Sequence, residues 1–273
     1  MSDRRVVLVT GSTDGIGRAT ARALAAAGLK VILHGRSKAR VEAAVAALQA
    51  ELPGAELDGV AFDLGSLKAV RAGAEQVLAK APALHVLVNN AGIFATERTV
   101  TADGIELTLA VNHVGPFLLT ELLVPRLVAS ATAHPSRVIN VSSIAHTRGQ
   151  INLADLNLGG AFTGYAAYAQ SKLANVMHAL ELAARHPATA LVAYAVHPGV
   201  IGTKLLRQGF GPVQGGTVEA GARAAARLAT AEEVDVPSGT YLSESTATPP
   251  STAARDAAVR SSLWDATRRL AGL

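Results

Sequence analysis

Short apolar runs alternate with alanine-rich segments of helical period, and this rhythm constrains the fold more than any other feature of the chain. Runs such as "VVLVT" and "LVAYAV" lack polar alternation, which is typical of strands buried on both faces. The strands expected are Val6–Thr10, Val31–His34, Gly59–Phe62, Val86–Val88, Arg137–Val141 and Leu191–Val196. The helices expected between them are Ile16–Ala27, Ala39–Glu51, Ser66–Lys80, Gly104–Ala129 (one long helix or two) and Tyr165–Arg185. Because parallel strands need crossover connections, the pattern predicts an α/β fold, a Rossmann-type doubly wound parallel sheet with helices on both faces.

The rhythm weakens after Gly199. The stretch "VIGTKLLRQGFGPVQGGT" is rich in glycine and has no clear period, so it predicts a mobile substrate lid at about residues 204–217. A helix is expected next, then a seventh strand at Thr240–Leu242, a surface loop at "STATPPST" and a closing helix at Trp264–Leu270. No linker and no repeat interrupts the chain, so residues 1–273 are interpreted as a single domain.

Composition excludes several classes of protein. A chain of 273 residues that is 49% hydrophobic and 17% charged is expected to form a globule with a substantial core. The net charge of +4 comes from scattered basic residues, which argues against a nucleic-acid partner and suits an anionic ligand. The absence of cysteine excludes disulfides and thiolate metal sites, and no two histidines have metal-ligand spacing on one helix face, so no metal is expected. No signal peptide and no apolar run of about 20 residues is present, which predicts a cytoplasmic protein without a membrane span.

A glycine-rich loop follows the first strand. Its G-x-x-x-G-x-G pattern allows a tight turn and close approach of a ligand to the backbone, and the helix after it offers free N–H groups to a pyrophosphate. The residues expected to bind a dinucleotide here are Gly11, Ser12, Gly15, Ile16 and Gly17. The alternative is a plain strand-to-helix turn. Asp14 is expected to cap the helix or to face solvent.

The second strand ends without a carboxylate. An NAD-specific site uses an acidic residue near this point for the ribose hydroxyls, whereas the chain has Gly35 and Arg36. A guanidinium can pair with a 2′-phosphate and lie flat on adenine. Arg36 therefore favours NADP(H) over NAD(H), and the alternative is a solvated residue after a strand.

Two tyrosines stand near a lysine in "GYAAYAQSK". On a helix, Tyr168 and Lys172 share a face at positions i and i+4, whereas the residue four positions after Tyr165 is alanine. A free phenol has a pKa of about 10, so a nearby ammonium that favours the phenolate would lower the pKa of Tyr168 toward the range useful for proton transfer. Tyr168 is the better candidate for an acid, and the alternative is a helix whose aromatic side chains fill the core.

The motifs that accompany these residues occur in one order along nearly the whole chain. They are "VTGSTDGIG", "FDL", "NNAG", "VNHVG", "VINVSS", "YAQSK" and "HPGVIGT". Together they resemble the short-chain dehydrogenase/reductase family. Within that family "SRVINVSSIAH", "LANVMHALELA" and "LWDATRRLAGL" look most like the retinol-dehydrogenase-like branch.

The resemblance implies a reaction and the residues that perform it. The catalytic residues would be Asn112, Ser143, Tyr168 and Lys172. Tyr168 would donate a proton to a carbonyl oxygen as a nicotinamide delivers hydride, while Ser143 would hydrogen-bond that oxygen. Lys172 would also hold the nicotinamide ribose, and Asn112 would hold a water that links Lys172 to solvent.

The same resemblance places further residues along the cofactor. The set beyond the glycine loop and Arg36 is Asp63, Leu64, Asn90, Gly92, Tyr168, Lys172, Ile201 and Thr203. Asp63 and Leu64 would contact the adenine, whereas Ile201 and Thr203 would close over the carboxamide and phosphates.

The gap between Ser143 and Tyr168 is about twice the commonest spacing of the family. The retinol-dehydrogenase-like branch has a comparable insertion, so residues 144–164 are interpreted as a loop beside the site, which makes Tyr165 a candidate substrate contact. The expected lid is apolar, with Leu205, Leu206 and Phe210, which predicts a bulky apolar carbonyl or alcohol substrate. Relatives are dimers, tetramers or monomers, so a homo-oligomer is one expectation.

Two other functions fit parts of the pattern. A non-catalytic dinucleotide-binding sensor or scaffold would have the fold without turnover, but such proteins usually lose the tyrosine or the lysine. A methyltransferase can use a similar sheet but leaves Arg36 and "YAQSK" unexplained. The sequence therefore favours an NADP(H)-dependent oxidoreductase of the short-chain type.

Overall fold

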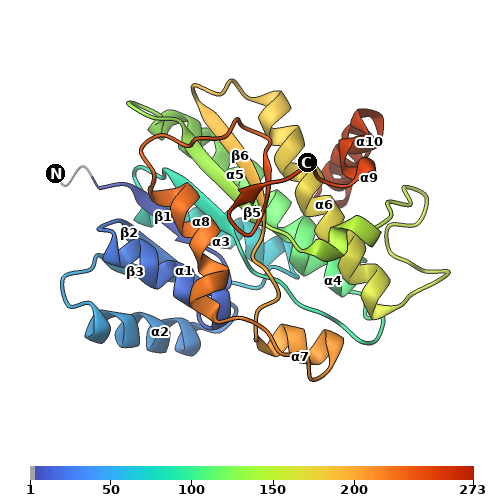
Figure 1. The fold of residues 1–273 in the computed structure, drawn as a ribbon, viewed down its shortest axis with the longest axis horizontal. Helices are drawn as coiled ribbons and strands as arrows, with labels where there is room; N and C mark the ends of the chain where they lie inside the picture. The colour runs from blue at the N-terminus through green and yellow to red at the C-terminus, as the bar shows by residue number, and fades with distance from the viewer. Residues whose placement is uncertain (1–3) are drawn as a thin grey trace.

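One eight-stranded sheet runs through the computed structural model, which describes residues 4–273 (Figure 1). The strand order is β3-β2-β1-β4-β5-β6-β7-β8, and all neighbours are parallel except β7 and β8. The strands are β1 (Val6–Val9), β2 (Lys30–Gly35), β3 (Leu57–Ala61), β4 (Val86–Asn89), β5 (Ser136–Val141), β6 (Leu191–His197), β7 (Tyr241–Ser243) and β8 (Thr246–Ala247). This order confirms the predicted doubly wound fold.

Helices cover both faces of the sheet. The helical elements are α1 (Gly15–Ala26), α2 (Lys38–Glu51), α3 (Leu67–Lys80), α4 (Leu107–Leu109), the π-helical turn η1 (Ala110–Val114), α5 (Gly115–Ser130), the 3₁₀ helix η2 (Ile144–Arg148), α6 (Gly164–Arg185), α7 (Lys204–Phe210), α8 (Val218–Thr230), α9 (Thr252–Arg255) and α10 (Ala257–Leu270). Buried side chains of α1, α2 and α8 form one core with the sheet, and those of α3, α5 and α6 form another on the opposite face. The central strands β1, β4, β5 and β6 are therefore buried on both sides, which explains their continuous apolar runs.

The chain leaves β1 toward β2 on one side and enters the other half of the sheet at β4. This reversal of strand order opens a crevice at the carboxyl ends of the strands, where ligands bind in open α/β sheets. The glycine loop lies at this crevice because it joins β1 to α1.

The largest differences from the predicted elements lie in the last third of the chain. Part of the expected lid is helical, as α7, and the strand β8 closes the sheet where a surface loop was expected. The last helix begins at Ala257, seven residues before Trp264. Trp264 anchors this helix, because its ring packs 4.8 Å from that of Phe117 and 4.5 Å from the guanidinium of Arg185.

The helical segment Leu107–Ser130 is long and apolar enough to cross a membrane by length and composition. However, 72% of its most apolar 18-residue stretch is buried inside the fold, where the helix packs against the sheet and α3. Burial of this kind is typical of a core helix, and it explains the apolar composition.

Candidate active site

Two cavities meet at the carboxyl ends of the strands. The first, of about 520 Å³, lies against the glycine loop, and the second, of about 300 Å³, lies against α7 and η2. Their shared wall consists of Ser142, Tyr168, Pro198, Thr203 and Leu205. A group bound in the first cavity can therefore reach a group bound in the second beside the Tyr168 side chain.

The glycine loop has a shape that only glycine permits. Gly11 and Gly15 have φ values of +64° and +56°, in the left-handed region. A Cβ atom on Gly17 would lie 2.3 Å from the Gly11 carbonyl oxygen, and one on Gly11 would lie 2.8 Å from Cα of Ala91. The loop thus brings bare backbone to the wall of the first cavity at the start of α1, which fits a pyrophosphate.

His34, which sequence reasoning missed, supports this loop from below. Its Nδ1 accepts from the Gly11 N–H at 3.1 Å, and its Nε2–H donates to the Phe62 carbonyl at 3.1 Å. Burial lowers the pKa of His34 to about 4, so the ring is neutral and keeps this tautomer. The only sequence signal was a histidine at the end of a buried strand.

Several predicted cofactor residues line the first cavity: Gly11, Gly15, Ile16, Gly17, Arg36, Asp63, Leu64, Asn90, Gly92, Tyr168, Lys172 and Thr203. Asn90 also braces the loop, because its Nδ2 donates to the Thr10 carbonyl at 2.8 Å. Asp14 caps α1 through the Gly15 N–H and pairs with Lys204 of α7 at 2.5 Å.

Two of the predicted cofactor residues lie elsewhere. The Ser12 hydroxyl is buried, donates to the Val9 carbonyl at 2.8 Å and accepts from the His34 N–H at 2.9 Å, so it ties β1 to β2 and does not line the cavity. Ile201 lines the second cavity, not the first, because it follows the turn after β6 at the far side of Pro198.

The wall beyond β2 is basic. Arg36 follows β2 directly, and Arg40, four residues further on in α2, lines the same cavity. The cavity also has two carboxylates, Asp14 and Asp63, but neither of them follows β2 directly. The Asp63 carboxylate accepts from the Gly65 N–H at 2.8 Å. Arg40 was missed by sequence reasoning, because Arg36 precedes α2 and the two residues share no helix face.

The phenol and a serine hydroxyl meet at the shared wall. Tyr168 lies in the first turns of α6, which Thr163 caps by accepting from the Ala166 N–H at 3.0 Å. Ser143 lies just after β5 and lines the second cavity. Its hydroxyl hydrogen-bonds the Tyr168 side chain. Burial raises the pKa of Tyr168 to about 12, against the smaller opposite effect of this hydrogen bond.

Lys172 does not lower the pKa of Tyr168 here, contrary to the sequence-based expectation. Its Nζ lies 5.6 Å from the centre of the phenol ring and donates to the Val141 carbonyl at 3.0 Å. Burial lowers the pKa of Lys172 to about 8. Removal from water is the largest effect on the pKa of both groups, so the phenol holds its proton at neutral pH.

Asn112 lies in the π-helical turn η1, behind the site. Its Oδ1 accepts from the Ile93 N–H at 2.8 Å, and its Nδ2 donates to the Ile93 carbonyl at 3.0 Å and to the Ser171 hydroxyl at 3.0 Å. Asn112 lines neither cavity. It fixes the segment after β4, which carries Gly92, against α6, while its predicted role toward a water stays a prediction.

His146 fixes the position of Ser143. Its Nδ1–H donates to the Ser143 carbonyl at 2.8 Å, and its Nε2 accepts from the Ser251 N–H at 3.2 Å. The ring also packs 4.7 Å from that of Tyr241. His146 therefore connects the loop before α9 to the serine at the site.

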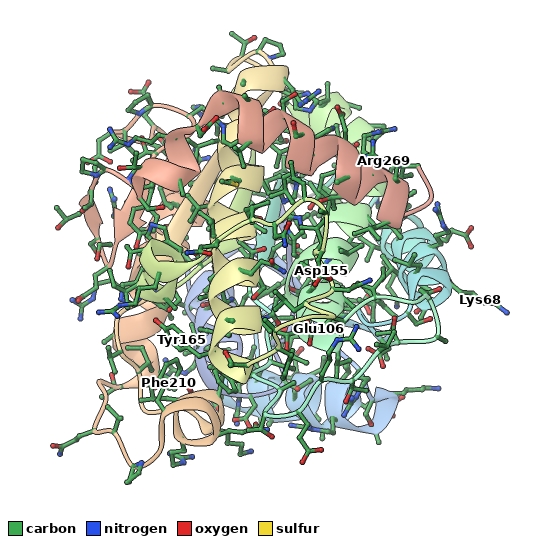
Figure 2. All side chains as sticks on the ribbon, turned by 90° about the vertical axis from the view of Figure 1, so that its right-hand side faces the viewer. Lys68, Glu106, Asp155, Tyr165, Phe210 and Arg269 are labelled. Carbon is green, nitrogen blue, oxygen red and sulfur yellow. The ribbon has the colours of Figure 1, made fainter. Side chains whose placement is uncertain are left out.

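Aromatic side chains from three segments close the second cavity. The ring of Phe210, on α7, lies 5.6 Å from Phe94, 6.0 Å from Tyr168 and 6.1 Å from Tyr165. Figure 2 shows Tyr165 and Phe210 side by side at the start of α6 and on α7. Tyr165 lines this cavity, as the insertion before it suggested.

The insertion itself is tied down. The Asp155 carboxylate accepts from the N–H groups of Gly159 and Gly160 at 2.9 and 3.1 Å, and Gln170 of α6 donates to the Leu156 carbonyl at 2.8 Å. Within residues 4–273, no group of three or more histidine, aspartate or glutamate side chains is placed to hold a metal ion.

A comparison with family models shows which protein family the chain matches. The family described as short chain dehydrogenase matches residues 5–210, which include the glycine loop, Ser143, Tyr168 and Lys172. The chain belongs to the short-chain dehydrogenase family. It is therefore an oxidoreductase of a family that binds nicotinamide dinucleotides.

Relatives narrow the branch. Bovine (Bos taurus) retinol dehydrogenase 12 is 40% identical over 278 residues, which cover 98% of this chain and 87% of the relative. Bovine dehydrogenase/reductase SDR family member 13 is 41% identical and covers 98% of this chain and 74% of its own length. These similarities confirm the resemblance to the retinol-dehydrogenase-like branch.

Solved structures agree with the fold. An uncharacterized protein from Mycobacterium paratuberculosis superposes with a TM-score of 0.81 at 33% identity, covering 98% of this chain and 93% of that one. The Pseudomonas aeruginosa RhlG/NADP active-site complex has a TM-score of 0.72 at 25% identity, with 88% and 94% covered.

Proposed function

We propose that this short-chain dehydrogenase is an NADP(H)-dependent enzyme that interconverts a bulky apolar carbonyl compound and its alcohol. The observation that carries the proposal is the meeting of Ser143, Tyr168 and Lys172 where the two cavities join. The presence of all three speaks against a sensor or scaffold without turnover.

The first cavity fits a dinucleotide by its bare-backbone loop and its basic wall. Gly11, Gly15 and Gly17 would hold the pyrophosphate, and Arg36 with Arg40 would hold a 2′-phosphate. When bound, the nicotinamide supplies or accepts the hydride.

The protein's own groups manage the proton. A phenol with its pKa raised to about 12 is protonated at neutral pH, so Tyr168 is ready to donate to the oxygen of a carbonyl that is being reduced. The Ser143 hydroxyl donates a second hydrogen bond to the same oxygen and stabilises its developing charge. Lys172, buried beside the phenol, lines the first cavity and would hold the nicotinamide ribose there.

Replacing the phenol tests this proposal. A Tyr168→Phe variant should lose at least about a hundredfold in kcat for NADPH-dependent reduction of aromatic and polycyclic ketones, because a general acid contributes this much or more. NADPH binding, followed by calorimetry, should persist. Tyr241→Phe is the matched control: it removes a buried phenol hydroxyl that has no hydrogen-bond partner and lines neither cavity. Equal turnover by wild type and Tyr168→Phe would disprove the assigned role.

Cofactor choice is tested at Arg36. We expect Arg36→Ala to raise the KM for NADPH about tenfold and to leave that for NADH unchanged, because only NADPH has the 2′-phosphate. Arg223→Ala, at an exposed position of α8 outside both cavities, should alter neither KM. A wild-type enzyme that prefers NADH would contradict this part of the proposal.

The lining of the second cavity supports the substrate class. Leu205, Leu206, Phe210 and Val213 present apolar surface to it, as predicted for the lid. A cytoplasmic location and a homodimer or homotetramer stay predictions, which cell fractionation and sedimentation test.

A further inference from the structure

The second cavity has one permanent cation on an otherwise uncharged wall. Its apolar lining is formed by Ile144, Ala145, Val200, Ile201, Leu205, Leu206, Phe210 and Val213. Of the aspartate, glutamate, lysine and arginine side chains in residues 4–273, Arg148 alone lines it. The other lysines and arginines near the site, among them Lys204 and Arg207, line the first cavity.

The Arg148 side chain is unpaired. It is exposed at the end of η2 and, within the described part of the chain, has no hydrogen-bond or ion-pair partner. Some other arginines are paired, for example Arg71, which donates to the Ala271 carbonyl at 2.8 Å, and Arg260, which donates to Glu181 at 3.2 Å. An unpaired guanidinium beside an apolar cavity can bind an anion from outside the protein.

Arg148 is also held at a set distance from the reacting group. Ser143 caps η2 and Arg148 ends it, and a 3₁₀ helix rises about 2 Å per residue, so the two backbones are separated by roughly 10 Å. His146 fixes this helix from the side opposite the cavity through Ser143 and Ser251. The carbonyl position and the cation therefore lie at two ends of one short rigid element.

We propose that the substrate is amphipathic, with its carbonyl or alcohol at one end of an apolar body and a carboxylate at the other, which Arg148 binds. A guanidinium fork matches a carboxylate with two parallel hydrogen bonds. The rings of Phe210, Tyr165 and Phe94 would cover the apolar body between the two ends. This inference rests on the proposed function and adds the charge and length of the substrate. A short oxo acid such as glyoxylate cannot span the separation, so size and charge are both required.

The test compares an ω-oxo fatty acid of medium chain length with its methyl ester, which has the same body without the charge. We expect wild type to show a higher kcat/KM for the acid than for the ester. Arg148→Gln should lower the acid-to-ester ratio about fivefold to tenfold and leave the ester unchanged, whereas Arg148→Lys should retain part of the preference. Arg223→Gln is the matched control and should leave the ratio unaltered. Added salt should reduce the ratio in wild type but not in Arg148→Gln.

Each outcome decides the proposal. A wild-type preference for the ester, or an acid-to-ester ratio that Arg148→Gln does not change, overturns the carboxylate site but leaves the oxidoreductase proposal intact. The folded protein could instead bind NADPH but reduce neither the ω-oxo acid, its methyl ester nor the aromatic and polycyclic ketones. In that case the proposed function fails, and this inference fails with it.

Discussion

Burial pushes the two ionisable groups of the active site toward their neutral forms. The pKa of the Tyr168 phenol is raised to about 12 and that of the Lys172 amine is lowered to about 8. Spacing in the sequence shows that two side chains share a helix face, but not how much water each one loses on folding. The direction of the tyrosine shift is therefore one part of the site that the sequence predicted wrongly.

A buried lysine kept for function is expected to lower stability. An unfolded lysine has a pKa of about 10.4, so between this value and about 8 the unfolded chain binds more protons than the native state. Stability lost to Lys172 is therefore restored as the pH rises from about 8 toward about 10.4.

We accordingly expect Lys172→Met to raise the free energy of unfolding by on the order of 1–3 kcal/mol near neutral pH, with the gain shrinking above about pH 8, while reductase activity falls. Urea unfolding of both proteins across this pH range measures the difference. A variant less stable than wild type at neutral pH would show that the hydrogen bond to Val141 outweighs the burial of the amine.

At the scale of elements, the glycine loop is the most sharply determined part of the site. Gly11 and Gly17 lie so close to backbone atoms of the loop and of the segment after β4 that no side chain fits. The left-handed φ values of Gly11 and Gly15 belong to the turn after β1 itself, which is why its sequence pattern was readable.

Gly17→Ala tests the loop. Its Cβ would lie 2.3 Å from the Gly11 carbonyl oxygen and 2.4 Å from Nδ2 of Asn90, so the loop must shift away from its present shape. We expect NADPH to bind at least about tenfold more weakly, as measured by calorimetry. Gly54→Ala is the control, because no atom lies within 4 Å of a Cβ placed there and its φ is not in the left-handed region. Unchanged binding in Gly17→Ala would refute the assignment of this loop.

Elements that depend on distant partners were less predictable. The buried strands, α1, α2, α3 and α6 follow from local periodicity, whereas α7 and β8 have weak patterns of their own. His34 and His146 were missed as supports of the site for the same reason, since their partners Phe62 and Ser251 lie 28 and 105 residues away. Contacts across such separations follow from the assembled fold.

The whole molecule places its chemistry at one edge and its neutral histidines in its interior. Burial lowers the pKa of His34 and of His113 to about 4, and that of His178 falls well below its usual value. Unfolded histidines have a pKa of about 6.5, so below that pH the unfolded chain binds more protons than the native state. Stability is then complete above about pH 6.5 and is lost as the pH falls toward 4.

Urea unfolding at about pH 7 and about pH 5 should therefore show a marked loss of stability in acid, to which each ring contributes up to about 2 kcal/mol over this interval. His113→Gln should reduce the loss, and His134→Gln, at an exposed position, should not. Identical pH dependence in wild type and His113→Gln would contradict the neutral state of this ring.

Helix α7 has no buried residue, yet it supplies much of the wall of the second cavity. Substitutions in residues 204–210 therefore alter what the enzyme accepts while the free energy of folding changes little. Ligand preference and foldability are encoded in largely separate parts of the chain. A lineage of such enzymes can diversify toward new compounds by drift in this one short helix, and a laboratory library confined to it should yield mostly folded proteins.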